Sequence, residues 1–160
     1  AYEIAGENCK IQPLVNWYLL ETILVQMSNH AWGKVVGTGK NQYTLTSMKE
    51  VKTLLADTER MISKNKQYAY SYTDKMTSID LSLCALLLEP KTAEQDTYDK
   101  LLQAYLDAWG QMKSVARKKE GIEQLEIIVS LLSFSADKAI IKVHKGLVEV
   151  YDALNKMLKS

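Results

Sequence analysis

Residues that break helices are scarce in this chain of 160 residues, which has two prolines and seven glycines. Proline removes a backbone donor, and glycine costs about 1 kcal/mol relative to alanine inside a helix, so their scarcity favours long helices. The length predicts one domain spanning residues 1–160, large enough to hold a core without disulfides or metals. A composition of 47% hydrophobic and 24% charged residues is typical of globular proteins and argues against disorder.

The chain also lacks an excess of charge of either sign: 20 basic and 19 acidic residues leave a net charge of +1. Proteins that bind nucleic acid usually carry a clear positive excess. A local basic face remains open as an alternative, for nucleic acid or anionic lipid. The lysine residues that would form this basic face are followed on the same helix by acidic residues, so a solvated helix face is the preferred interpretation. The candidate residues of this basic face are Arg117, Lys118, Lys119, Lys138, Lys142 and Lys145.

No apolar run is long enough to predict a membrane span. The most apolar stretch, residues 14–27, is interrupted by Asn16, Glu21 and Gln26 and is shorter than a bilayer requires. The first residue is Ala1, which is consistent with a removed export signal, a trimmed tag or an excised domain. We expect an exported protein rather than a cytoplasmic one, although the compartment stays open.

Cysteine and histidine are equally rare, with two of each. Cys9 and Cys84 permit one disulfide between the start and the middle of the chain, and the alternative is two reduced thiols. The residues three positions before His30 and His144 are not glutamates, so the Glu-x-x-His pairs of a di-iron bundle are missing. Two cysteines are too few for a structural zinc cluster. We expect no metal and no cofactor.

Catalytic motifs are absent as well. The segment Gly37-Thr38-Gly39-Lys40 resembles part of a phosphate-binding loop, but that loop needs a glycine at Lys34 and a hydroxyl residue at Asn41. Each histidine is more typical of a helix boundary than of a general base. The sequence therefore predicts a protein that is not an enzyme.

The spacing of apolar residues predicts five to six helices. Pro13 suits a first helical turn, so we expect residues 1–12 to be an N-terminal arm and a helix to follow as far as residues 30–32. That helix is apolar nearly all round, from Leu14 to Met27, which predicts a central and heavily covered position. Residues 33–46 form either a short β-hairpin across a glycine turn or a mobile loop.

Start and stop signals mark the remaining helices. Ser47–Glu50 and Thr92–Gln95 match the capping box, in which a hydroxyl and a carboxyl or amide satisfy orphan backbone donors. Between them a helix ends at Glu89-Pro90, and the next is expected to run to about Ala116, to carry residues 117–119 at its end and to stop at Gly121. Residues 122–158 form one long helix or two that meet near 133–135. The short connections predict an all-α, mostly antiparallel single bundle.

Aromatic side chains at junctions are the candidate contact residues, because tyrosine and tryptophan combine a large apolar area with a polar tip. They are Tyr68, Tyr70 and Tyr72 at one helix junction and Trp32 and Tyr43 around the glycine segment. We expect a non-enzymatic interaction protein, that is, an adaptor, assembly subunit or protein-binding module, with a second copy of the chain among the partners it allows. A nucleic-acid-binding subunit and a carrier of an apolar ligand between helices are the alternatives.

Overall fold

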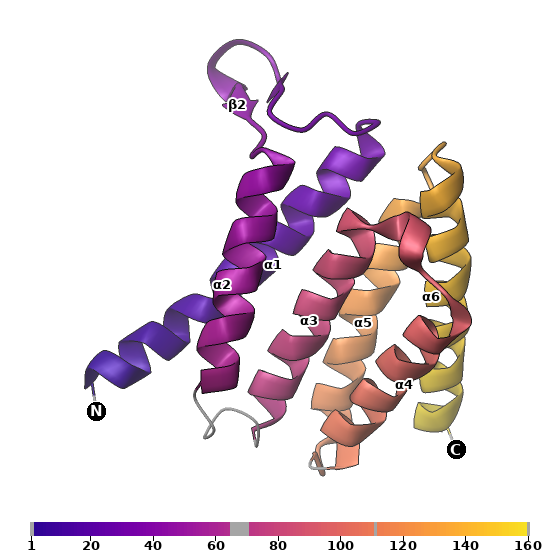
Figure 1. Ribbon diagram of the computed structural model, residues 1–160. Helices are drawn as coiled ribbons and strands as arrows, with labels where there is room; N and C mark the ends of the chain where they lie inside the picture. The colour runs from indigo at the N-terminus through magenta and orange to yellow at the C-terminus, as the bar shows by residue number, and fades with distance from the viewer. Residues whose placement is uncertain (1, 65–70, 111, 160) are drawn as a thin grey trace.

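The computed structural model describes residues 2–64, 71–110 and 112–159, and for residues 2–10 and 64 it describes the backbone alone. Six α-helices and a two-stranded sheet form the described part (Figure 1). The helices are α1 (Tyr2–Met27), α2 (Met48–Lys64), α3 (Tyr72–Leu88), α4 (Gln95–Gly110), α5 (Val115–Leu132) and α6 (Lys138–Lys159). The predicted all-α bundle is confirmed.

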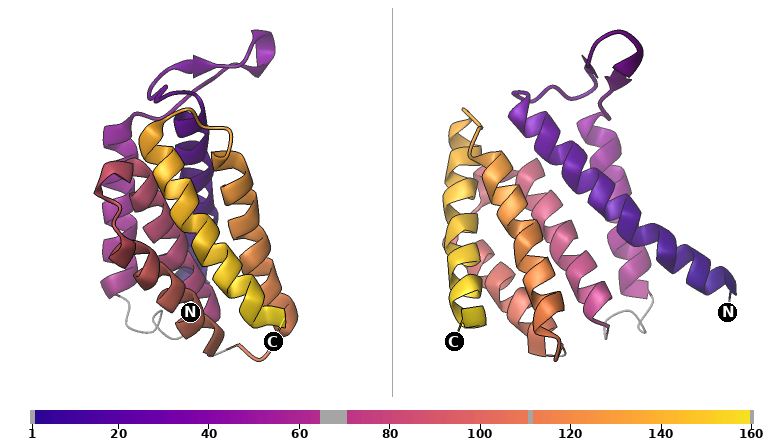
Figure 2. Two further views of the ribbon diagram at one scale, coloured as in Figure 1. Left: turned by 90° about the vertical axis from the view of Figure 1, so that its right-hand side faces the viewer. Right: turned by 180° about the vertical axis from the view of Figure 1, so that it is seen from behind.

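The central helix is α3, which contacts α1, α2, α4 and α6. Ten of its residues are buried, and they include two polar ones, Thr77 and Asp80. α5 and α6 pack side by side, and α6 also packs on α4, so these helices close the bundle on the side away from α2 (Figure 2). One core cluster draws buried side chains from all six helices. The six helices therefore share one main core.

α1 differs from the prediction at its beginning. It starts at Tyr2, so residues 2–12 are helical and Pro13 lies inside the helix instead of in its first turn. A proline inside a helix removes one hydrogen bond and bends the axis. Figure 1 shows α1 bent, with its N-terminal part pointing away from the other helices. At its other end α1 stops at Met27, and Asn29 and His30 follow with left-handed backbone angles.

Of the two interpretations of residues 33–46, the hairpin is confirmed. Strands β1 (Val35–Val36) and β2 (Tyr43–Thr44) pair antiparallel, with the 3-10 turn η1 (Gly39–Asn41) between them. Gly37 has a φ of 88°, and a Cβ there would lie 2.2 Å from the Asn41 carbonyl oxygen, so the turn needs glycine. A two-stranded hairpin is marginal alone, and here a small second core supports it. That core consists of Val25, Ala31 and Leu45.

Only one of the two predicted capping boxes forms. The backbone N–H of Ser47 donates to Glu50 Oε2 at 3.0 Å, and the N–H of Glu50 donates to Ser47 Oγ at 3.3 Å. The box at Thr92 is wrong, because Pro90 opens the 3-10 turn η3 (Pro90–Thr92) and the Thr92 hydroxyl donates to the Glu89 carbonyl instead. α4 begins two residues later than that box requires.

The segment 110–121 also differs from the prediction. α4 ends at Gly110, and α5 begins after Ser114, whose Oγ accepts from the N–H of Arg117 at 3.4 Å. The basic residues 117–119 therefore lie in the first turns of α5, and Gly121 lies inside that helix. A Cβ on Gly121 would meet the end of the Met76 side chain at 3.1 Å, so this glycine makes room for a side chain of α3. Residues 122–158 form two helices, and the turn between α5 and α6 follows Leu132.

Of the two alternatives for Cys9 and Cys84, the disulfide is not formed, because Cys84 is a free thiol that is completely buried in α3. Apolar surroundings raise the pKa of the Cys84 thiol, and the nearby Asp80 carboxylate raises it further. Cys84 therefore contributes to the fold as a small apolar side chain. Among the described residues, none of the helices is both long and apolar enough to cross a bilayer.

Candidate interaction surface

One side of α1 exposes large apolar side chains to solvent. We call it the outer face of α1, and it consists of Leu14, Trp17, Leu20 and Leu24, which are 40%, 52%, 45% and 38% exposed. Their spacing of three and four residues places them on one stripe of the helix. A single exposed leucine is ordinary on a protein surface, whereas a continuous apolar stripe marks a site of interaction.

The opposite side of α1 is buried in the core. Val15, Leu19 and Ile23 are at most 3% exposed and belong to the main cluster. A helix that is apolar all round is normally covered all round, which is why the sequence predicts a central position for it. The structure covers α1 with α2, α3 and α5 and leaves the outer face open, so the predicted heavy cover is wrong for this face.

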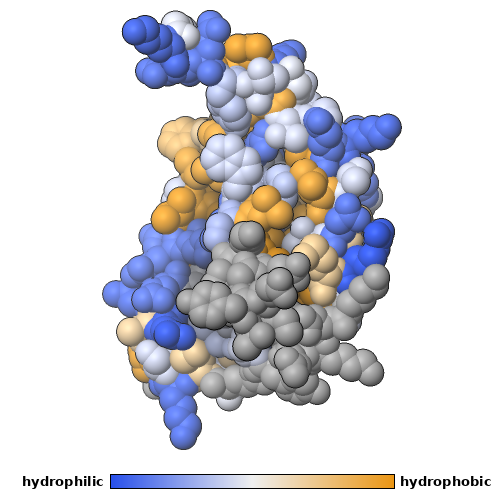
Figure 3. Space-filling view, turned by 90° about the vertical axis from the view of Figure 1, so that its left-hand side faces the viewer, coloured by the Kyte–Doolittle hydropathy of each residue, from blue (hydrophilic) through white to orange (hydrophobic). Residues whose placement is uncertain are grey.

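The surrounding elements leave the outer face accessible. In the right-hand view of Figure 2, α1 lies toward the viewer and crosses in front of α2. Figure 3 looks from the side of α1 and α2 and shows apolar side chains gathered below the hydrophilic tip of the hairpin. Leu54 and Met61 of α2 are also exposed, at 36% and 47%. Exposed apolar side chains thus lie on both α1 and α2.

The hairpin is fixed to α1 beside this face. The rings of Trp17 and Tyr43 meet edge to face with their centroids 6.3 Å apart. The buried Glu21 carboxylate accepts the backbone N–H of Thr46, which holds the end of the hairpin segment against the helix. Burial raises the pKa of Tyr43, and the Glu21 carboxylate adds to the rise. Tyr43 thereby forms one edge of the outer face as a neutral aromatic side chain.

The tyrosine junction predicted from the sequence is only partly described. Tyr68 and Tyr70 lie outside the described residues. Tyr72 is half-buried at the start of α3, and its hydroxyl donates to the Arg117 carbonyl at 2.9 Å. Burial raises the pKa of Tyr72, and the nearby Glu120 carboxylate raises it further by a smaller amount. Tyr72 therefore joins α3 to α5, and the described part of the junction serves packing.

Trp32 and Tyr43 were both predicted to be contact residues, but the structure gives them different surroundings. Trp32 is half-buried and packs against both the main core and the small core under the hairpin. Its position is that of a bridge between two cores. Tyr43 packs on the small core too, but its ring also reaches Trp17 of the outer face. Of the two, Tyr43 is the better placed for contact with a partner.

The six candidate residues of the basic face do not come together. α5 and α6 are antiparallel neighbours, and each group of three lies at the start or in the first half of its own helix (Figures 1 and 2). The two groups therefore lie toward opposite ends of the bundle. Lys142 donates to the Ala93 carbonyl at 2.8 Å, Lys119 lies 3.8 Å from Glu123, and the Lys118 ammonium lies 5.7 Å from the centre of the Trp109 ring. These contacts engage half of the six cations within the chain.

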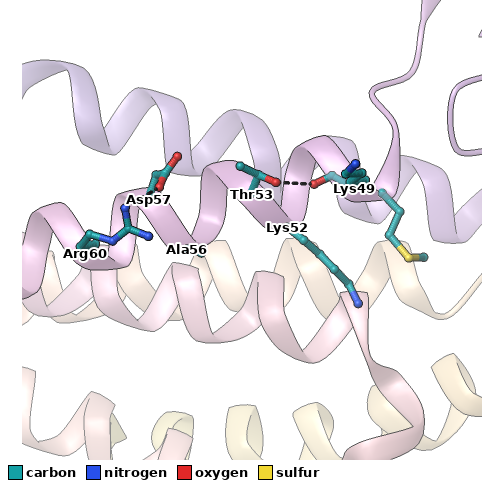
Figure 4. A pocket seen from close by; sticks show the side chains of 7 residues that line it. Lys49, Lys52, Thr53, Ala56, Asp57 and Arg60 are labelled. Atoms are coloured by element: carbon teal, nitrogen blue, oxygen red, sulfur yellow. Dashed lines mark hydrogen bonds and ion pairs between the residues drawn. The ribbon is translucent and has the colours of Figure 1, made fainter.

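An open groove of about 670 Å³ runs along the polar side of α2 (Figure 4). Two of the cations around it are paired: Lys52 lies 2.6 Å from Glu89, and Arg60 lies 3.2 Å from Asp57. Exposed ion pairs of this kind contribute little energy and leave little charge for a ligand. The groove is lined by Met48, Lys49, Lys52, Thr53, Ala56, Asp57 and Arg60, which all belong to one helix. It therefore has the character of a solvated helix face.

Two polar arrangements were not predicted from the sequence. His30 Nε2 lies 2.8 Å from Asp137 Oδ2, and the other oxygen of Asp137 accepts the N–H groups of Ala139 and Ile140 at the start of α6. The histidine contact and these backbone donors hold the pKa of Asp137 below its usual range. The arrangement ties the end of α1 to the start of α6. The two partners are 107 positions apart in the chain, so no local sequence signal links them.

The second arrangement lies in the core around Asp80, which is 2% exposed. Its carboxylate accepts from Gln124 Nε2 of α5 at 3.3 Å. Burial raises the pKa of Asp80 to about 7, and the Gln124 hydrogen bond acts in the opposite direction. The carboxylate in turn raises the pKa values of Cys84 and Tyr105, which are buried beside it. Since solvent does not reach these three groups, the cluster is a feature of the core.

The described residues hold no group of three or more histidine, cysteine, aspartate or glutamate side chains placed to bind a metal. Comparison with known proteins adds no further guide to the site: the chain matches no family model, no curated protein and no solved structure.

Proposed function

We propose that this protein is a non-enzymatic interaction protein, an adaptor or assembly subunit that binds another protein chain through the outer face of α1. The supporting observation is that α1 carries apolar side chains on two opposite sides while the fold covers only one of them. Burial of apolar surface is the main driving force of protein association. Trp17 is the natural anchor of such a contact, because tryptophan is enriched among residues that dominate binding energy.

Two further observations support this proposal over its alternatives. The buried polar cluster of Asp80, Cys84 and Tyr105 is closed to solvent, so a substrate would have no access to the most strongly perturbed side chains. The cations of the candidate basic face are divided between two ends of the bundle, and three of them already have partners. The phosphates of a nucleic acid would therefore meet dispersed and partly engaged charges instead of a continuous basic surface.

The experiment that tests this function compares two aspartate substitutions in affinity capture from cells that produce the protein. Leu20→Asp places a charge in the middle of the outer face. Phe134→Asp is the matched control, because Phe134 is 77% exposed in the turn after α5 and is not one of the residues of the outer face. Circular dichroism and thermal unfolding should show both variants folded, since neither side chain belongs to the core.

We expect the wild-type chain and the Phe134→Asp variant to capture the same proteins and the Leu20→Asp variant to lose them. Recovery of an identical set of proteins by all three chains would contradict a binding role for the outer face.

A further inference from the structure

We propose that the outer face of α1 binds a second copy of this chain through an antiparallel pair of α1 helices related by a two-fold axis. This inference rests on the proposed function, because it names the partner of the same face. Three features of the described residues support it: the positions of the apolar side chains along α1, the lack of exposed charge on this stretch of the helix, and the further exposed apolar side chains on α2.

The positions of the four apolar side chains are nearly symmetric about Leu19. Leu14 and Leu24 lie five residues to either side of it, and Trp17 and Leu20 lie close to it. In an antiparallel pair with the axis near Leu19, Leu14 faces the partner's Leu24 and Trp17 faces the partner's Leu20. A two-fold interface requires this property, since the same surface must be complementary to itself. The stripe spans about 15 Å along the helix.

The charge pattern favours a second copy over a charged partner. Residues 11–27 contain one charged side chain, Glu21, which is buried and bound to the hairpin segment. Near the axis of a two-fold interface a charged side chain lies close to its own copy, and like charges at short distance cost free energy. A face without exposed charge avoids this cost. An acidic or basic partner, by contrast, would find no opposite charge on the stripe.

The exposed apolar side chains of α2 are a source of the area that α1 alone does not supply. Stable interfaces bury roughly 800 Å² per partner, which exceeds what four partly exposed side chains provide. Lys52 reaches Glu89 at the end of α3, so it lies on the α3 side of α2. Leu54 follows two residues later, about 200° further around the helix, and therefore lies on the side of α2 away from α3. Met61 shares this side seven residues on. Both are exposed apolar side chains.

The experiment measures the molar mass of the purified wild-type chain by light scattering and sedimentation equilibrium, from micromolar to near-millimolar concentration. We expect a reversible monomer–dimer equilibrium. Leu20→Asp should weaken the dimer by at least about tenfold, because each partner would then bury an unpaired carboxylate against tryptophan. Phe134→Asp should leave the dimer unchanged.

A mixture of two variants tests the register. Trp17→Lys and Leu20→Asp should each be monomeric alone. Mixed, they should form a heterodimer, because the antiparallel register sets the new lysine against the partner's new aspartate and keeps one Trp17–Leu20 contact. A parallel pair or a shifted register would not restore association.

A wild-type chain that stays monomeric at every concentration would overturn the second copy, as would a dimer that Leu20→Asp leaves intact or a mixture that does not associate. The proposed function fails separately, when Leu20→Asp captures the same proteins as the wild-type chain. A monomeric wild-type chain whose capture still depends on Leu20 would mean that the outer face binds a different protein.

Discussion

The buried carboxyl of Asp80 should make the stability of the fold fall as the pH rises. Its pKa is about 7 in the folded chain, compared with 3.8 for an exposed aspartate. The folded state therefore holds this proton over a pH range in which the unfolded state has lost it. The contribution of Asp80 to the free energy of unfolding is fully present below about pH 4, declines as the pH rises from 4 to 7, and is lost above pH 7.

The size of the effect follows from the difference in pKa. One pKa unit corresponds to about 1.4 kcal/mol, so a shift from 3.8 to about 7 gives about 4 kcal/mol between the two ends of the range. The perturbation that isolates it is Asp80→Asn, which keeps the shape and can still accept the hydrogen bond from Gln124 but cannot ionise. Relative to the wild-type chain, the variant should gain about 1.4 kcal/mol for each pH unit between 4 and 7.

The assay is equilibrium unfolding in urea at constant ionic strength, from pH 4 to pH 8.5, for the wild-type chain and the variant. The quantity of interest is the difference between their free energies of unfolding, which cancels the contributions of all other titrating groups. Asp152→Asn on the exposed side of α6 is the control, because it removes a carboxylate that water already surrounds. A difference between wild type and Asp80→Asn that does not change with pH would refute the reasoning.

Three other predictions concern packing, capping and reactivity. Gly146→Ala should destabilise the fold by about 1–3 kcal/mol, because its Cβ would lie 2.3 Å from the Tyr98 ring. Gly110→Ala is the control, since its Cβ meets nothing within 4 Å, and it should be neutral or slightly stabilising. Thermal unfolding distinguishes the two variants, and equal losses of stability would contradict the packing at Gly146. Ser47→Ala should cost about 1 kcal/mol in urea unfolding by removing the α2 cap, and no loss would count against that cap. Cys84 should resist thiol reagents until the chain unfolds, because burial raises its pKa; mass spectrometry that detects its labelling in native buffer would show that the thiol is accessible.

Local signals predicted the elements that depend on neighbouring residues. The Ser47 box, the hairpin around Gly37 and the division of residues 122–158 each depend on side chains a few positions apart, and each was among the predictions. The same local reasoning missed the end of α4 at Gly110, because the apolar stripe continues beyond it. It also placed Gly121 at a helix end, whereas that glycine lies inside α5 next to the Met76 and Tyr72 side chains.

The candidate site was predicted less well, because its meaning depends on what the fold leaves uncovered. The sequence shows that α1 is apolar all round but not which side the other helices cover. The sequence indicated Tyr72 as a contact residue, but the Tyr72 hydroxyl donates a hydrogen bond to the Arg117 carbonyl, 45 positions away. It did not single out Trp17. The signal for the outer face was present nonetheless: a helix whose apolar residues exceed what one core can bury. Such an excess is a reason to look for a second contact.

The central claim is that protein covers the outer face of α1 when the chain functions. Covalent footprinting with mass spectrometry tests it directly, by comparing the labelling of Leu14, Trp17, Leu20 and Leu24 in the complex purified from producing cells with that in the dilute isolated chain. We predict strong protection of these four side chains in the complex and unchanged labelling of Phe134. Equal labelling of the four in both samples would contradict the claim.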